Sequence, residues 1–252
     1  RRPPRSTLSS SSAASDVYKR QLWDFAQWRP RHLFCDKAHG STSYIARPSF
    51  SPDGQLIAGG CSGTTLAFWD AASGTARQFL ERGDNIYDGL VESARFSPDG
   101  KTVAAAYWDG VVVLWDAATG ERTGTLALRP VGSQYPIVHF ATFSPDGQLI
   151  AAVGGAHAGT VDTSFAEIWD VDTGQRRWEL LGHMGWVASA DFSPDGQLLV
   201  TSGSDGQILL WDTETGQLER SMRESGVVGR AVFSPDGQLI ASAGTDNTAH
   251  LW

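Results

Sequence analysis

Cysteine is scarce in this sequence and long apolar runs are missing. Cys35 and Cys61 are the only cysteines among 252 residues, so a disulfide framework is not expected and a reducing compartment is favoured. A single bridge between the two is the alternative. No apolar run approaches the roughly 18 residues that a membrane-spanning helix needs. We therefore expect a cytoplasmic protein without a membrane segment.

Motifs for catalysis and cofactor binding are also missing. The sequence has no glycine-rich phosphate loop with a lysine, and its six histidines show no metal-ligand spacing. The stretch Asp170 to Gly174 imitates the start of a calcium loop, but Leu181 stands where the bidentate glutamate of such a loop would be. We expect no enzyme activity, no cofactor and no metal.

The first 21 residues differ in kind from the rest. They are rich in Arg and Ser, with Asp16 as the single acid. The stretch Asp16 to Gln21 reads as a translation of the transposon-end adapter used for sequencing libraries, so we interpret residues 1–21 as a non-native or disordered leader. A disordered tail or a targeting peptide is the alternative. We place the folded domain at residues 22–252.

Positive charge is low once the leader is set aside. The leader holds five basic residues, and the remainder has 15 Lys and Arg against 27 Asp and Glu, a net charge of about −12. Phosphate backbones and anionic lipids would repel such a domain. Neither nucleic acid nor a membrane is therefore an expected partner.

One pentapeptide, Phe-Ser-Pro-Asp-Gly, occurs five times and sets the period of the chain. The copies begin at Phe50, Phe96, Phe143, Phe192 and Phe233, and their period is 41 to 49 residues. A Trp follows each copy after 19 residues, or after 26 in the third copy: Trp69, Trp115, Trp169, Trp211 and Trp252. Such self-similarity indicates that one structural unit is repeated along the chain.

The fourth repeat shows what that unit is. The segments 187–192, 197–202, 207–211 and 217–222 are short and strand-like, and turn residues such as Ser-Pro-Asp-Gly separate them. Four antiparallel strands with turns every eight to twelve residues are typical of a propeller or a sandwich. The fixed period favours an all-β propeller of four-stranded antiparallel blades.

Residues 22–252 resemble the WD40 repeat family. Trp-Asp closes the repeats at Trp23-Asp24 and at four later places, and Gly182-His183 matches the dipeptide that often opens them. The resemblance implies a buried hydrogen-bond network of His183, a hydroxyl from Ser202 or Ser204, Asp205 and Trp211. Ser, His and Asp together suggest catalysis, but a buried and satisfied network rigidifies a blade, whereas a nucleophile must be exposed. We interpret it as structural.

The connections between strands differ in how much they vary. The Ser-Pro-Asp-Gly turn never changes, whereas the spacing from each Trp to the next Phe ranges from 22 to 28 residues, and the third repeat has seven extra residues within 154–165. In the strand order of the family, all variable connections lie on one face, which we call the long-loop rim. Because variable loops on a rigid scaffold usually carry binding, we predict that partners contact this rim through Arg82, Asp84, Tyr87, Arg129, Tyr135, His157 and Trp186.

The resemblance implies a non-catalytic scaffold that binds a protein or peptide. Rings of this family most often have seven blades, so we expect four complete blades and partial blades at both ends, a fragment of such a ring; closure into five blades is the alternative. The regular repeats are typical of bacterial members, where propellers are often attached to kinases or proteases. The second hypothesis is therefore the propeller portion of a larger enzyme or signalling protein.

Overall fold

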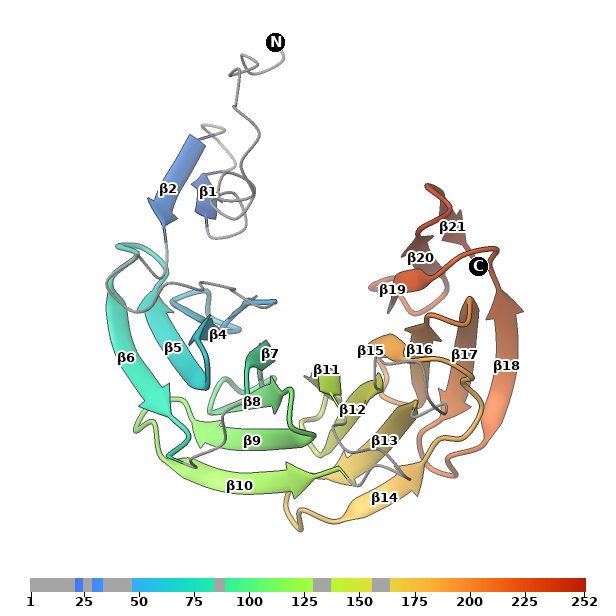
Figure 1. Ribbon diagram of the computed structural model, residues 1–252, viewed down its shortest axis with the longest axis horizontal. Helices are drawn as coiled ribbons and strands as arrows, with labels where there is room; N and C mark the ends of the chain where they lie inside the picture. Colours follow the sequence, from blue (N-terminus) through green and yellow to red (C-terminus); the bar gives the residue numbers. More distant parts are fainter. Residues whose placement is uncertain (1–20, 25–28, 34–46, 84–88, 129–136, 156–163) are drawn as a thin grey trace.

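The computed structural model describes residues 21–24, 29–33, 47–83, 89–128, 137–155 and 164–252, which form strands and turns without a helix. Figure 1 shows the strands as an open arc of sheets, which we call blades. We call the centre of the arc, which the inner strands face, the channel. The first two blades are β3 (Ser49–Phe50), β4 (Leu56–Ser62), β5 (Thr65–Asp70) and β6 (Ala76–Glu81), then β7 (Val91–Phe96), β8 (Thr102–Tyr107), β9 (Val111–Asp116) and β10 (Arg122–Ala127).

The third and fourth blades have the same four-stranded order, and the fifth has three described strands. The third is β11 (Ile137–Phe143), β12 (Leu149–Gly155), β13 (Phe165–Asp170) and β14 (Arg176–Glu179), and the fourth is β15 (Val187–Phe192), β16 (Leu198–Gly203), β17 (Gln207–Asp212) and β18 (Leu218–Arg223). The fifth is β19 (Val228–Phe233), β20 (Ile240–Gly244) and β21 (Ala249–Leu251), and β1 (Gln21–Asp24) pairs with β2 (Arg29–Leu33).

The predicted all-β propeller architecture is confirmed. Every strand pairs with its neighbours in antiparallel fashion, and the four strands predicted for the fourth repeat agree with β15 to β18 to within one residue at each end. The total number of blades stays a prediction.

Within the described blades, burial is high in the middle strands and low in the outer strands. The middle strands are buried on both faces, as β8 and β9 show, whereas the outer strands β10 and β18 are mostly exposed. This gradient explains the sequence, because a strand covered on both faces reads as a continuous apolar run and an outer strand reads as polar. The inner strands β7, β11, β15 and β19 lie side by side at the channel.

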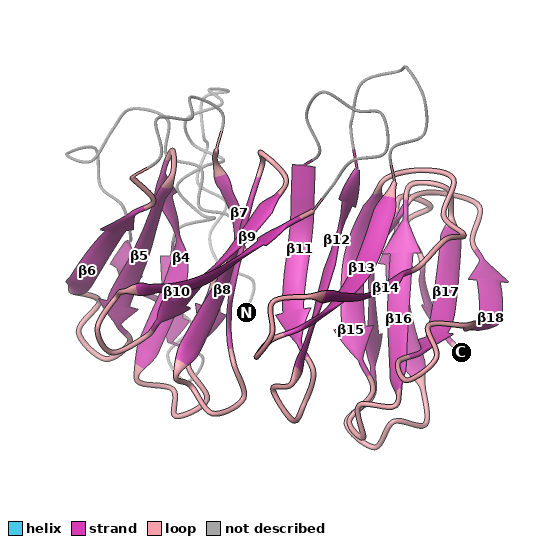
Figure 2. Ribbon diagram, turned by 90° about the horizontal axis from the view of Figure 1, so that it is seen from below, coloured by secondary structure: helices cyan, strands magenta, loops and turns pink. Residues whose placement is uncertain are grey.

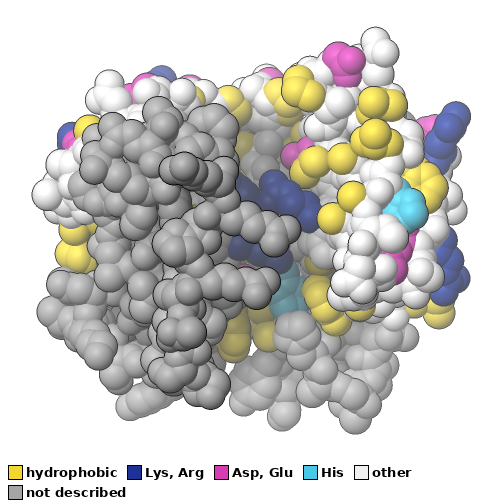
Figure 3. Space-filling view, turned by 90° about the horizontal axis from the view of Figure 1, so that it is seen from above, with side chains coloured by type: hydrophobic (Ala, Val, Ile, Leu, Met, Phe, Trp, Pro, Cys, Tyr) yellow, Lys and Arg dark blue, Asp and Glu magenta, His cyan; other side chains and the backbone are white. Residues whose placement is uncertain are grey.

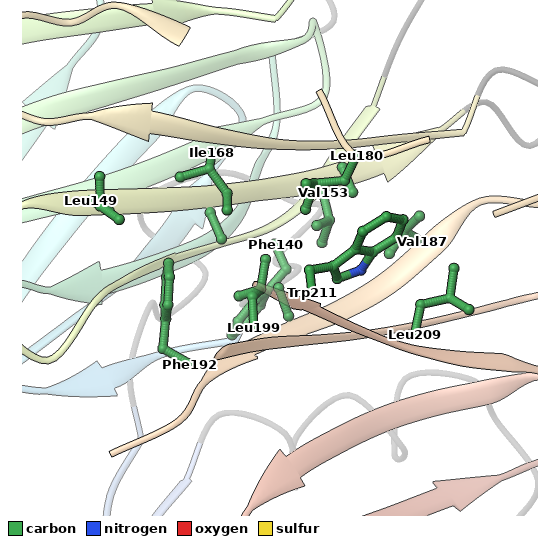
Figure 4. Close-up of a cluster of buried hydrophobic side chains, with 13 residues drawn as sticks. Phe140, Leu149, Val153, Ile168, Leu180, Val187, Phe192, Leu199, Leu209 and Trp211 are labelled. Atoms are coloured by element: carbon green, nitrogen blue, oxygen red, sulfur yellow. The ribbon is translucent and has the colours of Figure 1, made fainter. Parts of the chain in front are cut away.

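The hydrophobic cores lie between neighbouring blades. One cluster joins Phe140, Val153 and Ile168 of the third blade to Leu199 and Trp211 of the fourth (Figure 4). A second cluster likewise joins the first two blades around the ring of Trp115. The repeated Trp of a blade thus packs against the preceding blade, so each blade needs its neighbour to bury its faces.

The invariant turns lie on one face of the arc, which we call the turn face. In Figure 2, β11 points toward it and ends at its Ser-Pro-Asp-Gly turn. In the first copy of this turn, the Ser51 hydroxyl donates to Asp53 at 2.5 Å and accepts from the amide of Leu56 at 2.8 Å, and Gly54 has a φ of 71°. Because these bonds close the turn locally, it tolerates no change of length.

The cysteines correct one expectation. Cys61, buried in β4, is disulfide-bonded, so the view that both cysteines would be reduced is wrong for this residue. Cys35, the other cysteine of the sequence, lies outside the described residues. Within the described part of the chain, no helix has the length and apolar character needed to cross a membrane.

Candidate functional site

Four side chains of the fourth blade form a buried chain of hydrogen bonds. The indole Nε1 of Trp211 donates to the Thr201 hydroxyl at 2.9 Å, and that hydroxyl lies 2.9 Å from Nε2 of His183. The Nδ1 atom of His183 lies 3.0 Å from Oδ2 of Asp205. Because an indole N–H can only donate, all groups are satisfied when Thr201 donates to Nε2 and Nδ1 donates to Asp205.

The hydroxyl in this chain corrects the sequence interpretation, which gave the role to Ser202 or Ser204. Thr201 faces His183 and Trp211, whereas the Ser202 hydroxyl lies on the opposite side of β16 and bonds Ser189 at 2.8 Å. Successive residues of a strand point to opposite faces, so a shift of one residue changes the blade interface that a side chain meets. Ser204 follows the strand and takes no part in the chain among the described contacts.

The network is structural in its geometry. Thr201 is fully buried, and both ring nitrogens of His183 are occupied, so no nucleophile is exposed beside a base. Burial raises the pKa of Asp205, but the hydrogen bonds from His183 and from the amides of Met184 and Gln207 outweigh it and hold that pKa well below its usual range. The carboxylate therefore anchors the backbone around it.

The fifth blade carries a variant of the network. Glu224 stands where the fourth blade has His183, and its Oε1 accepts a short hydrogen bond from Ser242, which in turn accepts from Nε1 of Trp252 at 2.8 Å. Glu224 is buried and its Oε2 has no partner among the described contacts. A carboxylate thus replaces the imidazole, while the hydroxyl and the Trp keep their places.

Glu224 also belongs to a group of three residues that could hold a cation. Its ligand atom and those of Asp246 and His250 lie within 4.8 Å of one another. Asp246 already accepts from the amide and the hydroxyl of Thr248 at 2.9 and 2.7 Å. Both of these bonds go to Oδ1 of Asp246, and a group of acidic side chains does not by itself define a metal site.

The second blade carries a third variant, and it corrects the assignment of Arg82 as a partner contact. Arg82 is 8% exposed, its Nη1 lies 2.6 Å from Oδ2 of Asp109, and its guanidinium lies over the ring of Tyr107 at 5.0 Å. Asp109 occupies the turn position of Asp205, since each stands six residues before the Trp of its blade. Arg82 therefore takes the place of the histidine and points inward.

The described part of the long-loop rim is apolar around one loop, residues 180–186, between β14 and β15. Leu181 and Met184 are 78% and 72% exposed. Trp186 is half-buried, and its ring lies 5.3 Å from that of His139 on the neighbouring inner strand β11. The amide of Met184 donates to Oδ2 of Asp205 at 2.8 Å. The buried network thus holds in place the loop that presents these side chains.

The remaining predicted contacts lie outside the described residues: Asp84, Tyr87, Arg129, Tyr135 and His157. The strands around them agree with longer connections at this rim, since β12 ends at Gly155 and β13 begins at Phe165, whereas β8 ends at Tyr107 and β9 begins at Val111.

Sequence reasoning missed Glu224 and the buried role of Arg82. Glu224 could have been found, because it follows His183 by the same 41 residues that separate Trp252 from Trp211. Arg82 could not have been found in this way, because the connection that leads to the inner strand differs in length between the repeats. The sequence therefore does not align Arg82 with His183. Leu181 and Met184 give no sequence signal beyond their position next to Gly182-His183.

A sheet arc built from repeated four-stranded blades, with Trp, a turn Asp and a buried hydroxyl in the same chain, defines a class of repeat protein. The repeat profile described as "WD domain, G-beta repeat" matches residues 30–70, 84–116, 174–212 and 216–252, which are more than half of the chain. The chain therefore belongs to the WD40 repeat family.

The chain is similar to several proteins of eukaryotes. Apoptotic protease-activating factor 1 of Homo sapiens is 27% identical over 172 residues, which are 66% of this chain and 13% of that protein. The protein of the same description from Danio rerio is 30% identical over 92 residues, 36% of this chain and 7% of that protein. WD repeat and SOCS box-containing protein 1 of Homo sapiens is 36% identical over 93 residues, 36% of this chain and 20% of that protein. The chain thus spans no more than 20% of the length of these relatives.

Proposed function

We propose that this chain is a non-catalytic scaffold that binds a protein or peptide on the long-loop rim. The observation that carries the proposal is the loop at residues 180–186, which exposes Leu181 and Met184 beside Trp186. Exposed apolar side chains that lie together mark interaction sites, and Met and Trp are enriched in them. The bond from Met184 to Asp205 supports a preorganised loop, which lowers the entropy lost on binding.

The partner is a protein or peptide in this proposal. The acidic net charge, −8 for the whole chain, argues against nucleic acid and anionic membranes. A cytoplasmic location and a bacterial origin are proposals too. The first rests on the scarcity of cysteine and of long apolar runs, and the disulfide bond of Cys61 opposes it. The second rests on the regular repeats, whereas the similar proteins reported above are eukaryotic.

The test compares partner recovery between rim variants of the 252-residue chain. Met184→Ala, Leu181→Ala and Trp186→Ala, together with Tyr87→Ala and Tyr135→Ala, are used as bait against a lysate of the source organism. We expect each of the first three to lower recovery of the same partner. Leu239→Ala is the matched control, because Leu239 is 46% exposed and follows a Ser-Pro-Asp-Gly turn on the other face. Unchanged recovery in all rim variants, with the fold intact, would contradict the proposal.

A second candidate is the propeller portion of a larger enzyme or signalling protein. The length comparison favours it, because the relatives extend far beyond the matched part and one is described as a protease-activating factor. Determining the full reading frame around this sequence tests it directly. A catalytic or signalling domain in the same frame would support the second candidate, and a frame holding only propeller repeats would overturn it.

A further inference from the structure

Three arginines from different blades converge on one aromatic ring in the channel. The guanidinium carbons of Arg47, Arg95 and Arg230 lie 5.5, 4.9 and 5.9 Å from the centre of the Phe140 ring. Arg95, Phe140 and Arg230 stand on the inner strands β7, β11 and β19, and Arg47 precedes β3. In Figure 3, Lys and Arg side chains gather at the hollow in the centre of the view. The ring face favours this gathering of cations.

The positive charge at this place exceeds the negative charge around it. Burial, together with the charges of Arg230 and Arg47, lowers the pKa of Arg95 to about 10, and Asp191 opposes this shift only in part. Burial raises the pKa of Asp191, whose Oδ2 accepts from the amide of Phe233 at 2.8 Å. Among the described residues that act on Arg95, two further guanidinium groups and one carboxylate are charged, within a chain of net charge −8.

Two of these arginines have donors without a protein acceptor. Among the described residues, Arg95 and Arg230 make no hydrogen bond or ion pair, and their contact is the ring of Phe140. Arg47, by contrast, donates to the carbonyl of Ala188 at 2.9 Å. Arg95 is half-buried and Arg230 is exposed. A half-buried guanidinium without acceptors is costly, and a bound carboxylate or phosphate would satisfy Arg95 in a planar, two-bond geometry, with Arg230 as a further donor.

We propose that Arg95 and Arg230, with Arg47 and Phe140, form an anion site in the channel that binds a carboxylate carried by an extended segment of the protein partner. The inference rests on the proposed function and names the chemistry that a partner must present. Nucleic acid and anionic bilayers are not the expected ligands, because the net charge of the chain is −8. Arg95 lies near the end of β7 that meets the turn face. A partner segment that binds the long-loop rim must therefore extend past the rim into the channel to reach Arg95.

The experiment measures binding of two labelled peptides to the 252-residue chain by fluorescence anisotropy. One peptide alternates glycine and glutamate, and its counterpart has glutamine in place of glutamate. We expect the acidic peptide to bind. Arg95→Gln and Arg230→Gln should each raise the dissociation constant of this peptide about tenfold, as the loss of one charge-assisted pair predicts. Arg220→Gln is the matched control, because Arg220 lies exposed on the outer strand β18.

Charge reversal keeps the test sharp if Arg95→Gln unfolds, because Arg230 is exposed. Arg230→Glu should abolish binding of the glutamate peptide, because it leaves two guanidinium groups beside two carboxylates. Equal binding of the glutamate and glutamine peptides, or acidic binding that no channel variant changes, would overturn the proposal. Arginine-dependent stabilisation by inorganic phosphate without peptide binding would also overturn it, in favour of a small-anion site.

The two proposals fail separately. If the rim variants lose the partner but the acidic peptide does not bind, the scaffold function stands and the channel inference falls. If the acidic peptide binds through Arg95 and Arg230 while the rim variants keep the partner, the rim assignment falls and the channel remains.

Discussion

The guanidinium of Arg82 lies 2.6 Å from the carboxylate of Asp109, in the place that the imidazole of His183 takes beside Asp205 in the fourth blade. The two side chains are 5% and 12% exposed. Removing one partner leaves the other charge buried and unpaired, so we expect Arg82→Ala to lower the free energy of unfolding by about 3 kcal/mol. Urea denaturation followed by tryptophan fluorescence measures it.

A surface pair of the same length provides the control for Arg82. Arg77 and Asp70 also approach to 2.6 Å, but their side chains are 57% and 21% exposed. Arg77→Ala should therefore lower the free energy of unfolding by less than about 1 kcal/mol. Equal effects of Arg82→Ala and Arg77→Ala would contradict the buried role of Arg82.

We expect loss of the Thr201 hydroxyl to lower the free energy of unfolding more than loss of a nearby serine hydroxyl. Thr201→Val keeps the shape but removes the hydroxyl that joins His183 to Trp211, so two buried polar groups lose a partner. We expect a loss of about 1–3 kcal/mol in the free energy of unfolding. Thr201→Ser should recover most of it, and Ser204→Ala should stay near wild type. A harmless Thr201→Val would show that the chain of bonds does not stabilise the blade.

Acid should weaken the fourth blade through Asp205. The pKa of Asp205 in the folded state lies below the unfolded value of about 4. At pH values between these two pKa values the unfolded state binds more protons than the folded state, so the free energy of unfolding rises with pH in that range. The stabilisation is full above about pH 4 and is lost as the pH falls through the folded-state pKa. We expect Asp205→Asn to be less stable than wild type at neutral pH and the difference to shrink in acid. Urea midpoints at a series of pH values measure this, and a constant difference would refute it.

Glu224→His should stabilise the fifth blade. The wild-type carboxylate is buried, and one of its oxygens lies within 4.8 Å of a carboxylate oxygen of Asp246. The two negative charges repel each other. A histidine there can repeat the geometry of His183, with one nitrogen toward Asp246 and the other toward Ser242. We expect a gain of about 1 kcal/mol, measured as a rise in Tm. Glu224→Gln is the control, because it removes the charge without adding the two hydrogen bonds of the histidine. If Glu224→Gln raises the Tm as much as Glu224→His does, the new hydrogen bonds do not contribute to stability.

Much of the fold could be predicted from the chain because the repeat is regular. β15 ends at Phe192, where the pentapeptide begins, and β16 and β17 lie between this turn and the Trp211-Asp212 pair. The predicted strand ends agree with the structure to within one residue. The hydroxyl of the network was assigned to the wrong residue. Periodicity locates a strand, but a single position decides which face a side chain meets, and Thr201 and Ser202 differ by that one position.

The candidate site was less predictable because its parts come from different repeats. Arg82 was expected at the surface on its residue type, yet packing against Tyr107 and Asp109 draws it inside. Arg47, Phe140 and Arg230 stand three residues before the repeated Phe of their repeats, and Arg95 stands one residue before its own. The repeat register therefore places three of the four at equivalent positions, but it does not show that the side chains meet.

The sequence by itself determined the blade, because the local turns and the change from apolar middle strands to a polar outer strand are encoded within one repeat of 41 to 49 residues. Ser51, for example, closes its turn on Asp53 within a single repeat. Only the tertiary structure decided which residues meet at the channel and the rim. Curvature of the arc brings Arg47, Arg95 and Arg230 to one ring from positions up to 183 residues apart, and contacts over such separations depend on how blades pack together.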